Sequence, residues 1–175
     1  CLEIINKVNE DSSDDNIIIF SQFTLFFDFL GKILLDKDIK YLRYDGSMNL
    51  DQRDDCIKQF FKNPLKKVLL ISLKAGNFGL TLTCANHVII VDPFWNPYIE
   101  EQAMDRAHRI GQMKPVNVYR LLTTDTVEDR IVVLQEKKRE MVESALNQNA
   151  MTRISRLGRR ELRYLFGIAN RNETS

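Results

Sequence analysis

Residues 17–20 read Ile17-Ile18-Ile19-Phe20, an unbroken apolar run that decides the fold class of this chain. A strand with one solvated face alternates apolar and polar residues, whereas a continuous β-branched run is typical of a strand buried on both faces of a parallel sheet. We therefore predict a buried strand here. Two further apolar runs, at 68–71 and 88–91, are also of strand length.

Strand and helix patterns alternate outward from this run. An acidic turn at 11–16 separates it from a preceding helix, and a helical pattern follows it to about Leu35. The remaining predicted elements are a strand at 41–44, a helix at 49–61 capped by Asn49, a strand at 67–72, a glycine-bearing loop and short helix at 73–83, a strand at 87–92, a helix at 98–110 and a strand at 116–122. This alternation predicts an α/β fold with a mostly parallel sheet and flanking helices.

The pattern changes at Thr126, which we predict to cap one long helix. Glu128 and Asp129 place negative charge in its first turn, where it suits the helix dipole. The predicted domains are a lobe at 1–125, a long helix at 126–148 that braces the lobe, and a basic extension at 149–175 that contains a short helix.

The composition suits a globular domain, because 44% of the residues are hydrophobic and 28% are charged. The net charge of +1 conceals an asymmetry: residues 1–60 carry 7 Lys/Arg and 12 Asp/Glu, a balance of −5, which leaves +6 for residues 61–175. A basic second half suits an anionic partner.

The cysteines and histidines give no framework for a metal site or a disulfide. Cys1, Cys56 and Cys84 are far apart and form no C-x-x-C pair, and only His87 and His108 are histidines. We predict no metal site, and reduced thiols in a reducing compartment. The chain opens on cysteine rather than methionine and without a signal segment, so we expect a fragment of a longer protein.

Residues 102–112 read Gln-Ala-Met-Asp-Arg-Ala-His-Arg-Ile-Gly-Gln, with two arginines three positions apart. If residues 98–110 are helical, Gln102, Arg106 and Arg109 follow i, i+4, i+7 spacing and share one face. Two planar guanidinium groups on one face suit a polyphosphate. The alternative is a solvated helix whose arginines pair with nearby carboxylates, namely Glu100, Glu101 and Asp105.

Residues 72–83 combine a strand end with two glycines, Gly76 and Gly79. Glycine lets backbone N–H groups approach an anion closely, and the N-terminus of a following helix would add a favourable dipole. A structural turn is the alternative. The spacing is not a dinucleotide fingerprint, because G-x-G-x-x-G would require glycine at position 74, where this chain has Lys74.

Two other strand ends carry polar groups, Ser21-Gln22 and Asp45-Gly46-Ser47. Hydroxyl, amide and backbone donors at strand ends suit phosphate positioning and carry no base information. Taken separately, they also suit a helix cap and a turn. Trp95 is the only tryptophan and lies in a proline-flanked turn, where a tryptophan is more often a core anchor; the family resemblance described next implies an aromatic surface beside DNA, and the two interpretations are equally open.

These stretches resemble the motifs of superfamily-two helicases, in the form used by the Swi/Snf family of ATP-driven DNA translocases. Residues 102–112 are similar to its sixth motif, 72–83 to its fifth, 19–23 to its fourth, and 44–47 with Arg53 to the neighbouring block, all in family order. Asp105, His108 and Gly111-Gln112 are typical of the Swi/Snf form of the sixth motif. DEAD-box RNA helicases usually carry glycine at the position of Asp105. The resemblance implies a RecA-like lobe of the P-loop NTPase type.

The resemblance also implies roles for individual residues. Arg106 and Arg109, with Gln102, are implied to act catalytically as arginine fingers on the γ-phosphate of ATP, and Gly79 and Asp105 to lie at the nucleotide. Double-stranded DNA is the implied partner, contacted by Ser21, Gln22, Asp45, Gly46, Ser47, Lys74, Gly76 and Trp95.

The complementary half of such a site is absent from the sequence. No G-x-x-x-x-G-K-[ST] occurs, and no Asp-Glu pair that could hold Mg²⁺. ATP and Mg²⁺ are the implied cofactors, and both would require the N-terminal ATPase lobe of the same protein. We therefore expect the chain alone to be inactive.

The closing stretch, residues 157–167, looks like the end of the RING-bearing subgroup of this family, and within it of SUMO-targeted translocases. This likeness implies a nuclear chromatin remodeller with SUMO-modified chromatin proteins as further partners. Two alternatives stay open. One is a non-catalytic DNA- or protein-interaction module, which would not need the pair Arg106 and Arg109. The other is an RNA helicase lobe, which Asp105, His108 and the turn at 92–97 disfavour.

Overall fold

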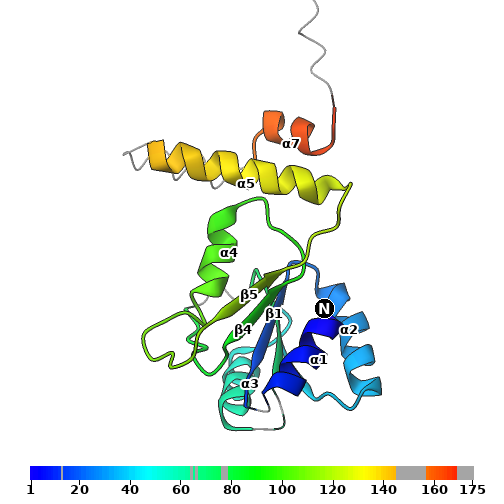
Figure 1. Ribbon diagram of the computed structural model, residues 1–175, viewed down its shortest axis with the longest axis vertical. Coiled ribbons are helices and arrows are strands. Elements are labelled where there is room, and N and C mark those ends of the chain that lie inside the picture. The colour runs from blue at the N-terminus through cyan, green and yellow to red at the C-terminus, as the bar shows by residue number, and fades with distance from the viewer. Residues whose placement is uncertain (13, 64, 66, 76–78, 145–156, 169–175) are drawn as a thin grey trace, which may run out of the picture. The chain divides into compact units, whose positions relative to one another are not determined.

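The computed structural model describes residues 1–12, 14–63, 65, 67–75, 79–144 and 157–168 (Figure 1). The chain divides into two compact units. The first, unit 1, comprises Cys1–Asp92 and Glu100–Leu121, and the second, unit 2, comprises Pro93–Ile99 and Leu122–Ser175.

Unit 1 is built on a five-stranded sheet in the order β2-β3-β1-β4-β5. The strands are β1 (Ile17–Ser21), β2 (Tyr41–Tyr44), β3 (Val68–Ser72), β4 (His87–Ile90) and β5 (Asn117–Arg120). Every neighbouring pair is parallel. The central strand β1 is buried along its whole length, as its apolar run predicts. The predicted α/β fold with a parallel sheet is confirmed.

Helices α1 (Leu2–Asp11) and α2 (Thr24–Asp36) lie side by side against the sheet (Figure 1). Alternate side chains of β1, Ile17 and Ile19, form a core with apolar residues of both helices, because successive strand residues point to opposite faces. The intervening residues Ile18 and Phe20 are equally buried. The core also includes Ile5, Val8, Phe27, Leu30, Leu34, Val68, Leu70 and Ile89.

Helix α3 (Leu50–Lys62) begins where the sequence predicts. The Asn49 side chain accepts a hydrogen bond from the Gln52 backbone N–H at 2.9 Å, and the Gln52 side chain accepts one from the Asn49 N–H at 3.0 Å. This reciprocal capping box satisfies two donors that the helix itself cannot. The cap prediction is confirmed.

The short helix predicted within 73–83 is wrong for the described part of that range, 73–75 and 79–83, which holds turns and irregular backbone. Gly79 has φ +58°, outside the right-handed helical region. The Leu82 N–H donates to the Arg106 carbonyl at 2.8 Å instead of to a carbonyl one turn earlier. A tertiary hydrogen bond thus replaces the helical one, and no helix N-terminus lies at these described residues.

The helix predicted at 98–110 is also too long. Helix α4 spans Pro97–Met104, and residues 105–112 form consecutive turns. Hydrogen bonds between residues i and i−3 tighten the chain here; the Ala107 N–H, for example, donates to the Met104 carbonyl at 3.0 Å. Gly111, near the end of these turns, has φ +103°. Arg106 and Arg109 therefore do not share a helix face.

Unit 2 contains α5 (Val127–Ser144) and α7 (Arg159–Leu165). The Thr126 hydroxyl accepts from the Glu128 N–H and the Asp129 carboxylate accepts from the Thr126 N–H, both at 3.1 Å, so the predicted cap is confirmed. Arg130 joins the helices by donating to the Leu165 carbonyl at 3.0 Å.

The domain boundaries predicted from the sequence remain a prediction. No helix among the described residues is long and apolar enough to cross a membrane.

Candidate functional site

A cavity of about 680 Å³ lies in unit 1 beside the turns that follow α4. Its lining gathers four of the residues predicted from the sequence, which are Gln102, Asp105, Arg106 and Arg109. Gln102 comes from α4, and the other three come from the turns. The predicted grouping is therefore present, although turns produce it rather than the helical spacing from which it was inferred.

Arg106 is half-buried at this cavity. Its Nε atom is buried and has no hydrogen-bond acceptor among the residues that the structure describes. A buried donor without an acceptor costs about 1–3 kcal/mol, and more for a charged group. An anionic oxygen bound in the cavity would offset this cost, so the position of Arg106 suits an anionic ligand.

Arg109 is exposed, and its Nη1 donates to the Thr81 hydroxyl oxygen at 2.9 Å. Leu82, next in the chain, is bonded through its N–H to the carbonyl of Arg106 at 2.8 Å. The loop after β3 thus holds both arginines. Sequence reasoning missed Thr81, because a hydroxyl two residues after Gly79 carries no spacing signal for a partner 28 positions away.

Gln112 fixes the end of the arginine turns. Its Nε2 donates to the Ala85 carbonyl at 2.7 Å and to the Ala107 carbonyl at 3.3 Å, and its Oε1 accepts from the Lys114 N–H at 2.9 Å. From the sequence, Gln112 was recognisable only as part of a motif ending. A side chain that bonds three backbone groups instead holds the rim of the cavity in place.

Lys114, also at this rim, forms an ion pair with Asp15 at 2.6 Å. The second carboxylate oxygen of Asp15 contacts His87 Nε2 at 3.1 Å. Burial acts to raise the pKa of Asp15, but hydrogen bonds from Lys114, Asn86 and His87 outweigh it and hold the pKa well below its usual range. The rim is therefore anchored to the segment that precedes β1.

A second group of predicted residues lies at the carboxyl edge of the sheet. Because all five strands are parallel, their carboxyl ends share one edge: Ser21 is in register with Ser72, and Tyr44 with Ile71. This is the edge at which open α/β sheets bind ligands. Lys74, two residues beyond β3, is exposed there.

Ser21 is fully buried at this edge. Its hydroxyl donates to Asp92 Oδ1 at 2.5 Å and accepts from the Phe23 N–H at 3.0 Å. The Gln22 N–H donates to the other Asp92 oxygen at 3.0 Å. These groups hold the turn after β1, and the Gln22 side chain beside them is half-buried. The DNA contact of Ser21 stays a prediction, and the geometry assigns its hydroxyl to Asp92.

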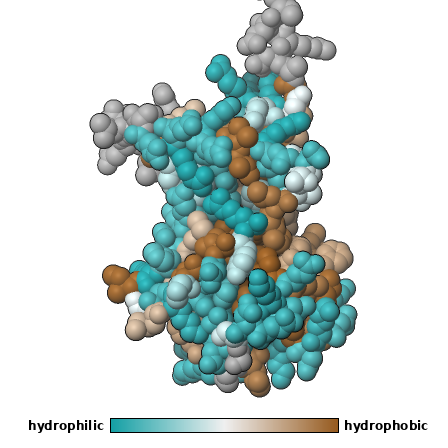
Figure 2. Space-filling model, viewed as in Figure 1, coloured by the Kyte–Doolittle hydropathy of each residue, from teal (hydrophilic) through white to brown (hydrophobic). Residues whose placement is uncertain are grey.

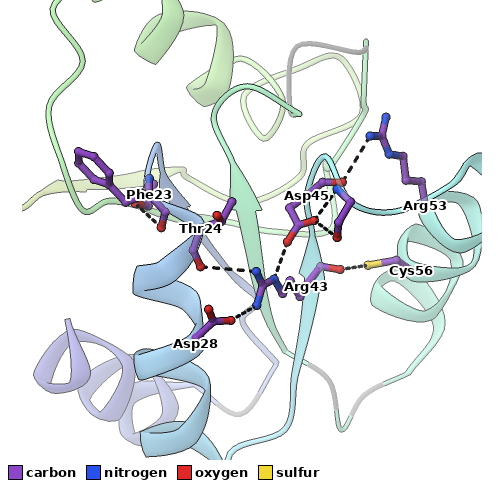
Figure 3. Close-up of polar contacts among 9 residues, drawn as sticks. Phe23, Thr24, Asp28, Arg43, Asp45, Arg53 and Cys56 are labelled. Atoms are coloured by element: carbon purple, nitrogen blue, oxygen red, sulfur yellow. Dashed lines mark hydrogen bonds and ion pairs between the residues drawn. The ribbon is translucent and has the colours of Figure 1, made fainter.

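Asp45 centres a second network at the end of β2 (Figure 3). Its Oδ1 accepts from the Ser47 N–H at 2.9 Å and hydroxyl at 2.6 Å, and its Oδ2 accepts from Arg43 Nε at 2.5 Å. Arg43 also pairs with Asp28 of α2. Burial acts to raise the pKa of Asp45, but the bonds from Ser47 and Arg43 lower it below its usual value.

The Asp45 carboxylate is buried and accepts hydrogen bonds only, so the geometry assigns it to shaping the turn, and its DNA contact stays a prediction. Gly46 and Ser47 are exposed in this turn. A Cβ added at Gly46 would meet no atom within 4 Å, so this backbone is open to an approaching ligand. Gly76, the other predicted glycine, lies outside the described residues.

Trp95 belongs to unit 2 and is half-buried. The ammonium of Lys138 lies 4.2 Å from the centroid of its ring, and the Phe94 ring lies at 5.4 Å. Lys138 is only 1% exposed, and burial lowers its pKa despite the opposing effect of Glu161. A cation–π contact therefore covers one face of the indole, which favours the core-anchor interpretation of the two that the sequence left open.

The side chains that line the arginine cavity suit an anion. The cavity presents guanidinium donors from Arg106 and Arg109, and Asp105 is the one carboxylate in its lining. In the described part of the chain, no three His, Cys, Asp or Glu side chains lie close enough together to hold a metal ion. The donor set thus fits phosphate oxygens.

Known proteins with similar sequences include helicases and a DNA repair protein. The model of the helicase conserved C-terminal domain matches residues 1–111. The chain is 55% identical over 169 residues to the ATP-dependent helicase ULS1 of Saccharomyces cerevisiae, covering 96% of this chain and 10% of that protein. It is 46% identical over 134 residues to the DNA repair protein rad8 of Schizosaccharomyces pombe, covering 77% of this chain and 12% of that protein.

Among solved structures, the chain is similar to the C-terminal part of the Fun30 ATPase domain. The TM-score is 0.73 at 36% sequence identity, covering 85% of this chain and 45% of that one. The chain therefore spans only a small part of its curated relatives and about half of this solved structure.

Proposed function

Because this chain belongs to the helicase conserved C-terminal domain family, we propose that it is the second ATPase lobe of an ATP-dependent translocase on double-stranded DNA, of the chromatin-remodelling type. The observation that carries the proposal is the cavity that gathers Gln102, Asp105, Arg106 and Arg109. The similarity to the helicase ULS1 supports the use of ATP.

In this proposal the two arginines act on the phosphoryl group that leaves ATP. Arg106 offers a buried Nε donor with no acceptor among the described residues, and Arg109 a guanidinium that Thr81 orients at 2.9 Å. Planar guanidinium groups bind phosphate oxygens in two places at once and stay charged at all relevant pH values. Arginine fingers in other enzymes accelerate phosphoryl transfer by about 10³–10⁵.

ATP and Mg²⁺, when bound, supply the scissile phosphoanhydride and neutralise its charge. The chain contains no P-loop sequence, so the phosphate cradle and the magnesium ligands are assigned to the N-terminal ATPase lobe of the same protein. Gln102 and Asp105 line the cavity beside the arginines and would contact the nucleotide or the arginines themselves. Gly79 would give the loop its left-handed bend next to the site.

DNA would bind along the carboxyl edge of the sheet. Lys74 and Ser47 are exposed there, Gln22 is half-buried, and Gly46 leaves its backbone open. These groups can contact phosphates from several strand ends at once, and such contacts position a duplex without reading its bases. Binding by this lobe is therefore sequence-indifferent in our proposal.

Further partners follow from the likeness of residues 157–167 to RING-bearing translocases. We include SUMO-modified chromatin proteins among them, with nuclear localisation, which the similarity to the DNA repair protein rad8 supports. Retention of the two-lobe protein on immobilised SUMO conjugates, compared with unmodified carrier, tests this narrower assignment. Equal retention on both would remove it without affecting the proposed ATPase role.

The experiment for the main proposal is DNA-stimulated phosphate release by the longer, two-lobe protein. Arg106→Ala and Arg109→Ala should each abolish stimulation while DNA affinity changes little, and Lys at either position should not restore it, because an ammonium lacks the planar fork. Arg159→Ala, an exposed arginine of unit 2, is the matched control. Wild-type turnover in both Ala variants would favour the alternative of a non-catalytic interaction module.

A further inference from the structure

A second cavity, of about 380 Å³, lies within unit 2 between α5 and α7. We call it the α5–α7 groove. Its apolar lining comes from Leu134 and Met141 of α5, from Tyr164 of α7 and from Ile168 just beyond it. Met141 is 57% exposed, Ile168 59% and Tyr164 40%, while Leu134 is buried below them. Apolar side chains interrupt the hydrophilic surface over these helices (Figure 2).

The polar rim of the α5–α7 groove is cationic. Lys137, Arg160 and Arg163 line it and are exposed. Its one lining carboxylate, Glu161, already accepts from the Gly158 N–H at 2.6 Å and pairs with the buried Lys138 at 3.5 Å. The groove therefore offers three exposed cationic side chains beside its apolar floor, of which Lys137 lies with its ammonium 5.0 Å from the centroid of the Tyr164 ring, and the one carboxylate of its lining is engaged internally.

We propose that the α5–α7 groove binds an amphipathic segment of a protein partner, with apolar side chains on one face and Asp or Glu beside them. The site lies in a unit separate from the arginine cavity, so the inference does not depend on the proposed ATPase role. Apolar side chains of the segment would enter between Met141, Tyr164 and Ile168, and its carboxylates would face the rim. This is the helix-in-groove mode of recognition.

The residue types favour a peptide over a nucleic-acid backbone. Phosphates would use only the rim cations and leave the exposed Met141, Tyr164 and Ile168 in water, whereas an amphipathic peptide buries that area at about 25 cal/mol per Å². Tyrosine, methionine and arginine are enriched at protein interfaces. Methionine also adapts its shape to different apolar partners. Charge complementarity then selects an acidic segment.

The test uses the full 175-residue chain and a fluorescein-labelled probe peptide of about four helical turns, with Leu at i, i+3, i+7 and i+10 and Glu or Gln elsewhere. Fluorescence anisotropy measures its binding. A peptide of the same composition with the Leu positions permuted tests the apolar face, and one with Lys in place of Glu tests the charge. We expect saturable binding of the first peptide and at least about tenfold weaker binding of both others.

Variants of the chain locate the binding. Met141→Asp, and separately the pair Arg160→Glu with Arg163→Glu, should each weaken the probe at least about tenfold, as loss of an interface anchor does. Arg159→Glu is the matched control, because it reverses a charge on the same helix outside the groove lining and should change affinity less than about twofold. Circular dichroism melting of every variant establishes that it folds.

Three outcomes would overturn the proposal. In the first, a mixed-sequence DNA duplex displaces the probe, and duplex binding falls with the Arg160 and Arg163 reversals but not with Met141→Asp; the groove is then a phosphate site. In the second, the probe binds only a chain that lacks residues 169–175, which makes the chain's own end the occupant. In the third, permuted and regular peptides bind alike, which reduces the contact to general charge attraction.

Discussion

Thr81 accepts a hydrogen bond from Arg109, with 2.9 Å between the hydroxyl oxygen and Nη1, across 28 positions of sequence. The neighbouring Leu82 N–H bonds the Arg106 carbonyl at 2.8 Å. Two adjacent residues of the loop after β3 thereby hold the two arginines, one through a side chain and one through the backbone. The orientation of the exposed Arg109 guanidinium depends on this loop.

We predict that Thr81→Val in the two-lobe protein lowers DNA-stimulated ATP turnover about 2- to 10-fold, because an exposed hydrogen bond of this kind is worth about 0.5–1.5 kcal/mol. Thr81→Ser keeps the hydroxyl and should restore turnover. Steady-state kinetics with ATP as the varied substrate measure both. A structural defect would affect the Val and Ser variants alike, and a loss shared by both would contradict the positioning role.

The 175-residue chain alone should hydrolyse ATP negligibly, because its sequence contains no P-loop to cradle the phosphates. Phosphate release in the presence of duplex DNA is the measurement, with the two-lobe protein as positive control. Turnover by the isolated chain at the level of the control would refute the division of the active site between two lobes.

Lys74→Ala should weaken duplex binding equally for all sequences and lower the slope of log K against log salt by about 0.9, the value of one phosphate contact. For the isolated chain we expect a Kd of about 10⁻⁴–10⁻⁶ M, as in non-specific binding. Lys7→Ala, an exposed lysine of α1, is the charge-matched control. If removal of residues 153–175 eliminates binding while Lys74→Ala has no effect, the basic tail is the DNA contact.

Asp15 should stabilise the fold in a pH-dependent way. Its folded pKa lies well below the unfolded value of about 3.9, so its contribution is fully present above that pH and is lost as pH falls through the folded pKa. Asp15→Asn should therefore lower the free energy of unfolding at about pH 7 and matter less in acid. Urea unfolding followed by circular dichroism tests this, with exposed Asp36→Asn as control. If Asp15→Asn lowers the free energy of unfolding equally at about pH 7 and in acid below the unfolded pKa, this pH dependence is contradicted.

At the carboxyl edge of the sheet, the sequence predicted the strands but not all of the contacts between their ends. The apolar runs at 17–20 and 68–71 require burial on both faces, and this predicted parallel strands in the correct places. In a parallel sheet the residues after each strand share an edge, which is why the structure brings Gln22, Ser47 and Lys74 to the same edge. The role of Asp92 did not follow, because its bond to Ser21 joins positions 71 apart, and no local pattern signals it.

The arginine site divides in the same way. The sequence by itself determined four of the residues that line it, since the identities and order of Gln102, Asp105, Arg106 and Arg109 identify a helicase motif whatever the backbone conformation. Only the tertiary structure decided how they meet. Local spacing predicted a helix through position 110, but contacts from Leu82 and Thr81 hold the chain in turns after Met104. Apart from proline, residues differ in helix propensity by at most about 1 kcal/mol each, so hydrogen bonds from a distant loop can override it.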